Sequence, residues 1–298
     1  MTKTDNKIFQ ASLLVAASGI LYGFLGFLGT TILQDNISIA TMLFWRFVLA
    51  GSWIIFCVFK NTSSSKMAHF LDKRTLFFMF ILGAIGYAGS SVFYFIASQY
   101  TGTGLAMVIF FSYPIIVALS SWLIQKKSFN KGILLTLMMM MIGFILLQDF
   151  STNQVNITGI FFGVIAAVCY AFYVIGSKHI TSQPVDENVL TAIVCFGCAF
   201  IFLLLSVSSN SFILPTSIKT WVYLIALGIL ATALPIQLML KGLKYVSSMR
   251  ASIISVLEPL VTVLVGIVLL DESISHLQLI GAVIILSSAL LVQFQKEL

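Results

Sequence analysis

The chain alternates between long apolar runs and short polar stretches from one end to the other. Ten runs are apolar for about 20 residues, which is the length of helix that crosses the hydrocarbon core of a bilayer. They cover residues 10–31, 39–59, 75–96, 103–124, 132–148, 158–178, 188–208, 217–239, 248–270 and 276–294. The polar connections are short, and the longest runs for fifteen residues from Lys60 to Arg74. The pattern therefore predicts ten transmembrane spans and no separate soluble domain.

The runs are predicted to be helices and not strands. A membrane β-barrel needs segments of about ten residues that alternate between apolar and polar positions. Ile133–Leu147 and Val261–Leu270 are apolar at successive positions and do not alternate. The first run is kept as a span, because it is too long for a signal-peptide core and no convincing small-residue cleavage site follows it. The predicted fold class is an all-α integral membrane protein.

The composition agrees with this fold and narrows the function. Hydrophobic residues make up 59% of the 298 residues and charged residues 9%, with a mean hydropathy of +1.07. Soluble domains carry about 25% charged residues, so this chain has too few charges to cover a soluble fold. A disordered chain, a disulfide scaffold, a soluble enzyme and a nucleic-acid binder are excluded. The lipid bilayer is the predicted partner, and nothing in the sequence decides between a monomer and an oligomer.

The positions of the basic residues predict the orientation in the membrane. If the N-terminus is cytoplasmic, fourteen of the sixteen Lys and Arg residues lie on the cytoplasmic side. Only Lys219 lies outside, and Arg46 lies within the second span. Four of the five outer loops (34–38, 98–102, 148–157 and 271–275) contain no Lys or Arg. Because cytoplasmic loops are enriched in basic residues, both termini are predicted to be cytoplasmic, in the inner membrane if the chain is bacterial. The net charge of +6 is then a topological signal and not a ligand surface.

The second half of the chain repeats the first at a shift of about 145 residues. Five spans precede the second copy, so an odd number of crossings turns it upside down in the membrane. The turn after the fourth span reads Lys126-Lys127, whereas the equivalent turn after the ninth span reads Asp271-Glu272. The matched pairs are Tyr100 and Tyr245, Ala106 and Ala251, Pro114 and Pro259, Leu119 and Leu264 and, at a shift of 148, Tyr22 and Tyr170. The sequence predicts two inverted five-helix repeats, residues 1–152 and 153–298, an arrangement typical of alternating-access transporters.

These motifs resemble the EamA group of the drug/metabolite transporter superfamily. The second half carries the closer resemblance, in LKYVSSMRASIISVLEPLVTVLVGIVLLDESISHLQLIGAVIILSSALLV. Its matching features are the Glu258-Pro259 pair, the acidic Glu272 just after the ninth span, and Gly281 in the tenth.

In the first half, Arg46 of LFWRFVLAG fits the arginine that the group has in its second span. Tyr113-Pro114 stands where many members have Glu-Pro, and Lys126-Lys127 replaces the usual acidic residue. The resemblance covers nearly the whole chain. It implies a fold of ten spans and export of amino acids or related metabolites, and it leaves the substrate itself open.

Two formal charges lie well inside the predicted spans, Arg46 and Glu258. An ionisable group at membrane depth is costly unless it is paired or wetted, so each is a candidate functional residue. We hypothesise that they interact directly or through water. Glu258 has two interpretations: proton coupling or contact with substrate, and a structural role beside Pro259, where the helix is opened.

The other candidate residues for a substrate cavity are aromatic or helix-breaking. Apolar pockets with a few polar groups are typical of binding sites, although many aromatics of a membrane protein face lipid. Pro114 and Pro259, at equivalent positions of the two halves, are candidate hinge or gate residues, or bends that only help packing. The aromatic candidates are Tyr22, Trp45, Tyr87, Tyr94, Tyr113 and Tyr170, with polar groups from Ser90, Ser91, Ser112, Gln237, Ser255 and Thr262.

No cofactor or metal is predicted. The four cysteines lie in spans and are interpreted as apolar packing, and the three histidines lack metal-ligand spacing. No phosphate-binding loop or nucleophile motif is present, so the chain itself is not an ATP-driven pump.

The predicted function is a secondary transporter or facilitator of a small-molecule substrate that works by alternating access. The alternatives are a membrane-embedded enzyme acting on lipid-linked substrates, and a channel. The acidic residues of the outer loops are too dispersed to form the active site of such an enzyme. The sequence also lacks the filter loop or ring of charge that a channel needs.

Overall fold

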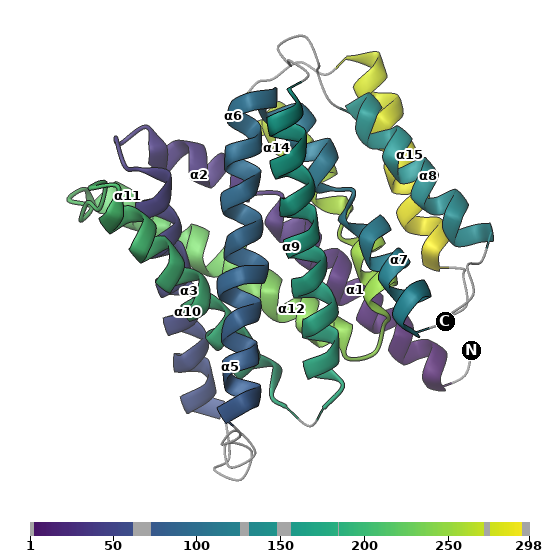
Figure 1. Ribbon diagram of the computed structural model, residues 1–298, viewed down its shortest axis with the longest axis horizontal. Helices are drawn as coiled ribbons and strands as arrows, with labels where there is room; N and C mark the ends of the chain where they lie inside the picture. The colour runs from purple at the N-terminus through teal and green to yellow at the C-terminus, as the bar shows by residue number, and fades with distance from the viewer. Residues whose placement is uncertain are drawn as a thin grey trace.

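The computed structural model describes residues 3–61, 73–125, 131–147, 156–183, 185–270 and 275–293, and every regular element within these ranges is a helix (Figure 1). Backbone groups in a bilayer must be satisfied internally, which helices achieve within one segment. The first half consists of α1 (Lys3–Tyr22), α2 (Leu25–Leu33), α3 (Ile39–Asn61), α5 (Lys73–Ile81), the π-helix η2 (Leu82–Tyr87), α6 (Ala88–Phe110), α7 (Tyr113–Gln125) and α8 (Lys131–Leu147).

The second half follows the same order with two differences, since its first span is unbroken and two separate helices, α12 and α13, stand where the first half has the single α6. It consists of α9 (Ile157–Thr181), α10 (Glu187–Ser208), α11 (Ile218–Gly228), the π-helix η3 (Ile229–Ala233), α12 (Leu234–Leu243), α13 (Ser248–Ile254), α14 (Leu257–Leu270) and α15 (His276–Gln293). Polar side chains cap several of these helices. Asn156 and Asp186 each accept from a backbone N–H two residues on, at 2.8 Å, and so start α9 and α10.

Ten spans are built from these elements, as predicted. Seven helical segments of the described residues are long and apolar enough to cross a membrane, and three shorter apolar helices complete the set. Spans 1 and 9 each consist of two helices, α1 with α2 and α13 with α14, and span 8 joins α11, η3 and α12. The all-α membrane fold is confirmed.

The junction between spans 3 and 4 is tighter than the predicted loop at residues 98–102. The chain stays helical up to Gly102, whose φ of 77° interrupts α6. The rings of Tyr94 and Phe110 lie 5.7 Å apart, whereas sixteen residues of continuous helix would separate them by about 24 Å. The chain therefore folds back on itself at a single glycine, the residue that adopts this backbone conformation without strain.

Irregular backbone occurs at equivalent places in the two repeats. The π-helices η2 and η3 interrupt spans 3 and 8, and non-helical residues at 111–112 and 255–256 divide spans 4 and 9. Both divisions lie just before the prolines that the repeat aligns. The inverted repeat is thus visible in the backbone as well as in the side chains.

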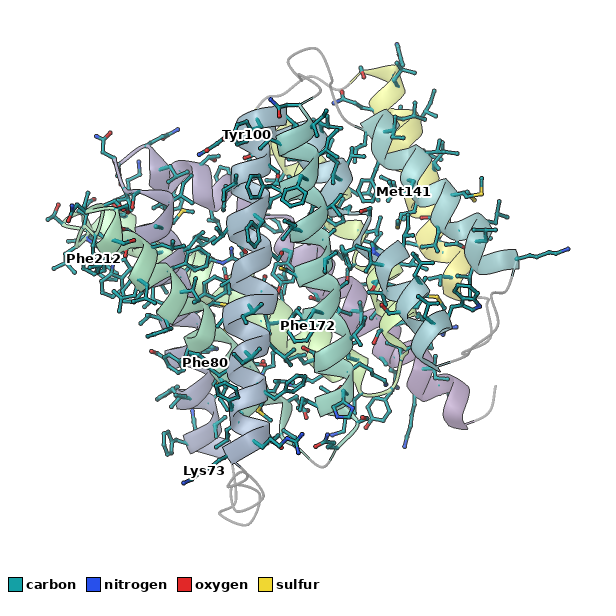
Figure 2. The ribbon with its side chains drawn as sticks, in the orientation of Figure 1. Lys73, Phe80, Tyr100, Met141, Phe172 and Phe212 are labelled. Atoms are coloured by element: carbon teal, nitrogen blue, oxygen red, sulfur yellow. The ribbon has the colours of Figure 1, made fainter. Side chains whose placement is uncertain are left out.

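The helices pack in pairs that follow the same symmetry. In Figure 1, α6 lies along α9 in the centre and α8 lies along α15 at one flank, and the same contacts link α3 with α10 and α1 with α12. Figure 2 places Lys73 and Tyr100 at opposite ends of span 3, so this span runs the full height of the molecule.

Two glycines at the repeat shift of 145 let these pairs approach closely. A Cβ atom on Gly83 would lie 2.2 Å from the carbonyl oxygen of Val194 on α10. A Cβ atom on Gly228 would lie 3.0 Å from the carbonyl oxygen of Arg46 on α3. Small residues are the usual means of close helix contact in membranes. Spans 3 and 8 are therefore held against spans 7 and 2 at the level of the π-helices.

Some predicted features lie outside the described residues. They are most of the connection from Lys60 to Arg74, the Lys126-Lys127 turn, the Asp271-Glu272 turn and the boundary between residues 152 and 153.

We predict that Gly83→Ala destabilises the fold strongly, because the new methyl group would meet backbone that cannot rotate away. Gly89→Ala is the matched control in the same span, since its Cβ would meet only the Cys169 sulfur at 3.6 Å, an ordinary contact. Overpacking of this kind costs about 1–3 kcal/mol. Thermal unfolding in detergent measures the difference, and equal stability of the two variants would contradict the proposed contact.

Candidate functional site

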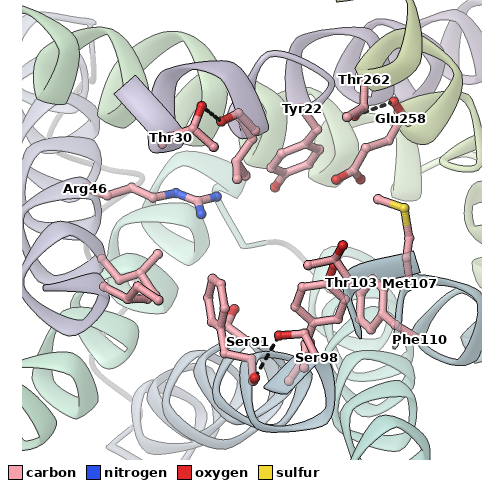
Figure 3. A pocket seen from close by; sticks show the side chains of 18 of the residues that line it. Tyr22, Thr30, Arg46, Ser91, Ser98, Thr103, Met107, Phe110, Glu258 and Thr262 are labelled. Atoms are coloured by element: carbon pink, nitrogen blue, oxygen red, sulfur yellow. Dashed lines mark hydrogen bonds between the residues drawn. The ribbon is translucent and has the colours of Figure 1, made fainter. Parts of the chain in front are cut away.

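A cavity of about 490 Å³ lies in the middle of the bundle, bounded mainly by spans 1 to 4. This volume lies in the range typical of small-molecule sites. Its walls are mostly apolar, and one basic and one acidic side chain face it, Arg46 and Glu258 (Figure 3). Most of the wall comes from the first repeat, and the second repeat contributes Tyr170, Glu258 and Thr262.

Arg46 is positioned by a hydroxyl from the other repeat. Its side chain leaves the middle of α3 and is 3% exposed. Its Nε donates to the Thr232 hydroxyl on η3 at 2.6 Å, and that hydroxyl donates to the Leu227 carbonyl at 2.7 Å. The guanidinium carbon also lies 4.9 Å from the centre of the Phe47 ring. The buried Nη2 has no hydrogen-bond partner within the described part of the chain.

Glu258 faces Arg46 from the opposite wall of the cavity (Figure 3). It is the second residue of α14, directly after the division of span 9. Its backbone N–H donates to the Ser255 carbonyl at 3.1 Å, which satisfies the backbone at the break. Among the described residues no ion pair joins Glu258 to Arg46, so the hypothesis of direct pairing is not supported. Between them the two charges give the cavity one positive and one negative wall.

Tyr22, Tyr87 and Tyr170 line the cavity together with the two charged residues. Tyr87 donates to the Tyr22 hydroxyl at 3.2 Å, which links span 3 to span 1. The Tyr87 and Tyr170 rings lie 5.8 Å apart at an edge-to-face angle of 66°. Such packing fixes aromatic side chains in place. The cavity thus presents hydroxyl groups on a rigid aromatic base.

The structure brings six of the eight predicted substrate-site residues to this cavity, namely Tyr22, Arg46, Tyr87, Tyr94, Tyr170 and Glu258. Tyr113 does not line it. It is 1% exposed, packs on Tyr170 at 4.6 Å and donates to the Ser252 carbonyl at 3.3 Å. The division of span 4 starts a new helix at Tyr113 and turns this side chain into the core.

Trp45 also lies away from the cavity. Its ring packs on Trp221 at 5.0 Å and on Phe212 at 6.3 Å. One residue turns a helix by about 100°, so Trp45 and Arg46 on α3 point in different directions. The prediction that Trp45 belongs to the substrate site is therefore not supported by this cavity.

Pro114 and Pro259 do not break the helices at their own positions, contrary to the expectation from the sequence. Pro114 and Pro259 are the second and third residues of α7 and α14. A proline in the first turn of a helix removes no intrahelical hydrogen bond. The break therefore comes before each proline, at 111–112 and 255–256, and the proline starts the second half of the span. Pro259 places Glu258 in the first turn beside the cavity.

Several polar residues of the site were not singled out from the sequence. Thr30, Ser98 and Thr103 line the cavity together with the expected Ser90, Ser91 and Thr262, whereas Ser112, Gln237 and Ser255 do not. Thr232 was also missed, although the repeat offered a signal. At the shift of 145 it aligns with Tyr87, and each residue places a hydroxyl beside a π-helix.

No candidate metal site is found in the described ranges. No group of three or more His, Cys, Asp or Glu residues gathers there. The four cysteines are free, and Cys195 and Cys198 are buried. The Cys198 thiol donates to the Gly83 carbonyl at 3.3 Å, which places it in the packed contact between spans 3 and 7.

Comparison with known proteins identifies two copies of one family unit in this chain. The model of the EamA-like transporter family matches residues 10–148 and 157–294. The second copy confirms the repeat that the sequence predicts.

Two of the following similar proteins are named as transporters. An uncharacterized inner membrane transporter, YicL, of Salmonella typhimurium is 25% identical over 95% of both chains. An uncharacterized transporter of Archaeoglobus fulgidus is 29% identical over 66% of this chain and 70% of its own length. Protein PecM of Dickeya dadantii is 26% identical over 72% of this chain and 73% of its own.

A crystal structure of another protein matches the fold with a TM-score of 0.80, covering 94% of this chain and 95% of the other at 17% identity. The fold is therefore shared at low sequence identity. The family match over both repeats shows that the chain belongs to the EamA-like transporter family of the drug/metabolite transporter superfamily, as a multi-pass membrane transporter and not an enzyme.

Proposed function

We propose that this chain is a secondary transporter or facilitator that exports small organic metabolites, amino acids or related compounds, by alternating access. The central cavity is the observation that carries the proposal. It combines apolar and aromatic walls with one guanidinium and one carboxylate on opposite sides. Such a cavity suits a small solute with an apolar body and polar ends. Both repeats contribute to its wall, as at the substrate site of alternating-access transporters.

The orientation of the cavity supports an outward-facing state. Its wall continues from Arg46 and Glu258 toward the ends of the helices at Thr30, Ser98 and Thr103. These residues border the connections 34–38 and 98–102, which carry no basic residue. With the N-terminus in the cytoplasm, this end faces outward. We place the chain in the inner membrane of a bacterial cell, the location given in the name of the Salmonella relative.

The divided spans supply gate elements for the proposed cycle. The outer half of span 1, α2, forms one wall of the cavity and is separated from α1 at residues 23–24. The divisions of spans 4 and 9, at 111–112 and 255–256, occupy equivalent positions in the two repeats, and each lies just before a candidate hinge proline, Pro114 or Pro259. Short helices joined by irregular backbone can tilt separately, so the cavity can close on one side and open on the other.

Glu258 is the proposed coupling group for protons. It is the one carboxylate among the described residues that line the cavity. A carboxylate in a membrane cavity, without a basic partner, can accept a proton from one side and release it to the other. Its first-turn position on α14 ties its charge state to the division of span 9.

A comparison of metabolites inside and outside cells, with and without this chain, first selects a candidate solute. The function is then tested by counterflow of that solute into proteoliposomes that contain the purified chain. We expect exchange that saturates with one solute. Flux that rises linearly with concentration would indicate a channel and contradict the carrier mechanism.

Thr30→Cys is predicted to react with a membrane-impermeant thiol reagent added outside intact cells, because Thr30 lies in the cavity wall. Ala11→Cys is the control, since Ala11 is buried at the other end of span 1 at 1% exposure. The unsubstituted chain, with its four cysteines in the spans, sets the background. Labelling of Thr30→Cys no greater than that of Ala11→Cys and of the unsubstituted chain would contradict the proposed outward-facing state.

Glu258→Gln is predicted to make the transport rate independent of an imposed pH gradient, because the amide cannot carry a proton. Asp35→Asn is the control: Asp35 accepts from Thr220 outside the cavity and is expected to leave the gradient dependence intact. Initial rates in proteoliposomes at several gradients measure both. Full gradient dependence in Glu258→Gln would exclude proton coupling through this residue.

A further inference from the structure

We infer that Arg46 and Thr232 form a subsite for the carboxylate end of the cargo, with Thr232 as the positioning residue. The inference rests on the proposed function and assigns the two ends of the solute to the two walls of the cavity. It follows from three observations. Arg46 donates to Thr232, which donates in turn to Leu227; Nη2 of Arg46 has no hydrogen-bond partner among the described residues; and Glu258 lies on the opposite wall of the cavity.

The relay fixes one edge of the guanidinium. The Thr232 hydroxyl has a single proton, which it donates to the Leu227 carbonyl at 2.7 Å. Its oxygen is thereby left as an acceptor, and it receives the Arg46 Nε–H at 2.6 Å. Since Leu227 and Thr232 are five residues apart across the π-helix η3, the irregular backbone itself aims this hydroxyl at Arg46. The plane of the guanidinium is set before any ligand arrives.

The terminal edge of the guanidinium, formed by Nη1 and Nη2, lies beyond the Nε–H that Thr232 binds and has no acidic partner among the described residues. Nη2 is buried and makes no hydrogen bond within the described part of the chain. No terminal nitrogen of Arg46 is paired with an acid there, and the side chain points into the cavity (Figure 3). Arginine stays charged in proteins, and its planar fork matches the two oxygens of a carboxylate. A buried charge without a partner is costly, so this edge is built for an anion that the chain does not supply.

The other wall favours a carboxylate in a zwitterion over a multiply charged anion. Glu258 faces Arg46 across the cavity, with Tyr22 between them (Figure 3). A solute with a carboxylate on Arg46 and an ammonium toward Glu258 would neutralise both walls, and the tyrosine faces favour the cation as well. A dianionic phosphate would instead meet the like charge of Glu258.

Thr232 acts through Arg46 and not on the cargo directly. It is 0% exposed, and it does not line the cavity. The close approach of span 8 to the Arg46 backbone at Gly228 holds it in place. Loss of its hydroxyl is therefore expected to alter recognition of one functional group of the solute, whereas a general packing defect would affect every solute alike.

The test compares the wild type with Thr232→Val, which keeps the shape of the side chain and removes the hydroxyl. Proteoliposomes are given a whole-cell metabolite extract, and mass spectrometry identifies the solutes that show saturable uptake. For one such acid, inhibition of uptake by the acid is then compared with inhibition by its carboxamide. The ratio of the two inhibitory concentrations is the acid preference. We expect Thr232→Val to raise KM for the acid and to lower the acid preference about tenfold, with little change in the maximal rate and with recovery in Thr232→Ser.

Thr191→Val is the matched control. Thr191 is also buried, at 0% exposure, and its hydroxyl bonds only back to Glu187 on its own helix. It is expected to keep the acid preference. If Thr232→Val does not fold, Arg46→Lys decides, because it keeps the charge but loses both the fork and the bond to Thr232, and the same loss of preference is expected.

Three results would count against the inference. Transported solutes without a carboxylate would overturn it, as would an equal loss of acid and carboxamide uptake in Thr232→Val or a defect that Thr232→Ser does not restore. Absence of saturable uptake in the wild type is a different outcome, because it would reject the proposed function itself.

Discussion

One buried positive charge governs how the centre of this molecule is built. Arg46 sits in the middle of span 2, where little of it is exposed and no acid of the described residues pairs with it. The chain instead offers a neutral acceptor, the Thr232 hydroxyl, from the opposite repeat. That bond requires span 8 to lie against span 2, which Gly228 permits, and it requires the π-helix that aims the hydroxyl. The two repeats are thus tied together at the charge that also faces the cavity.

The irregular backbone is concentrated where the protein can satisfy it. Unpaired N–H and C=O groups are too costly against lipid and are tolerated at membrane depth only beside protein or a cavity. The divisions at 23–24, 111–112 and 255–256 and the π-helix η2 lie at or next to residues that line the central cavity, whereas η3 packs inside the protein against α3. Local backbone hydrogen bonds satisfy groups at the divisions, such as the bond from the Ile115 N–H to the Ser112 carbonyl at 2.9 Å. The helices are therefore broken beside the cavity or inside the protein, because backbone groups there do not have to face lipid.

The sequence was sufficient for the spans, the repeat and the two central charges, because hydropathy and self-similarity are local properties of the chain. Arg46 and Glu258 stand out since a charge at membrane depth is costly and therefore rare away from functional sites. Side-chain direction was harder. Tyr113 and Trp45 adjoin Pro114 and Arg46 in sequence, yet a helix break turns the first into the core and the helical twist turns the second away. The π-helices and the turn at Gly102 depend on contacts between distant spans, so no local pattern announces them.

The symmetry of the scaffold does not extend to the chemistry of the cavity. Span 1 is divided after Gly23, whereas span 6 is continuous through Ala171, which stands at the equivalent position. Tyr87 and Thr232 occupy matching sites, but one donates to Tyr22 and the other accepts from Arg46. A protein at 17% identity shares the fold with a TM-score of 0.80, so backbone similarity persists while side chains diverge. We therefore propose that specificity lies in the few polar groups that break the symmetry, among them the guanidinium that Thr232 positions.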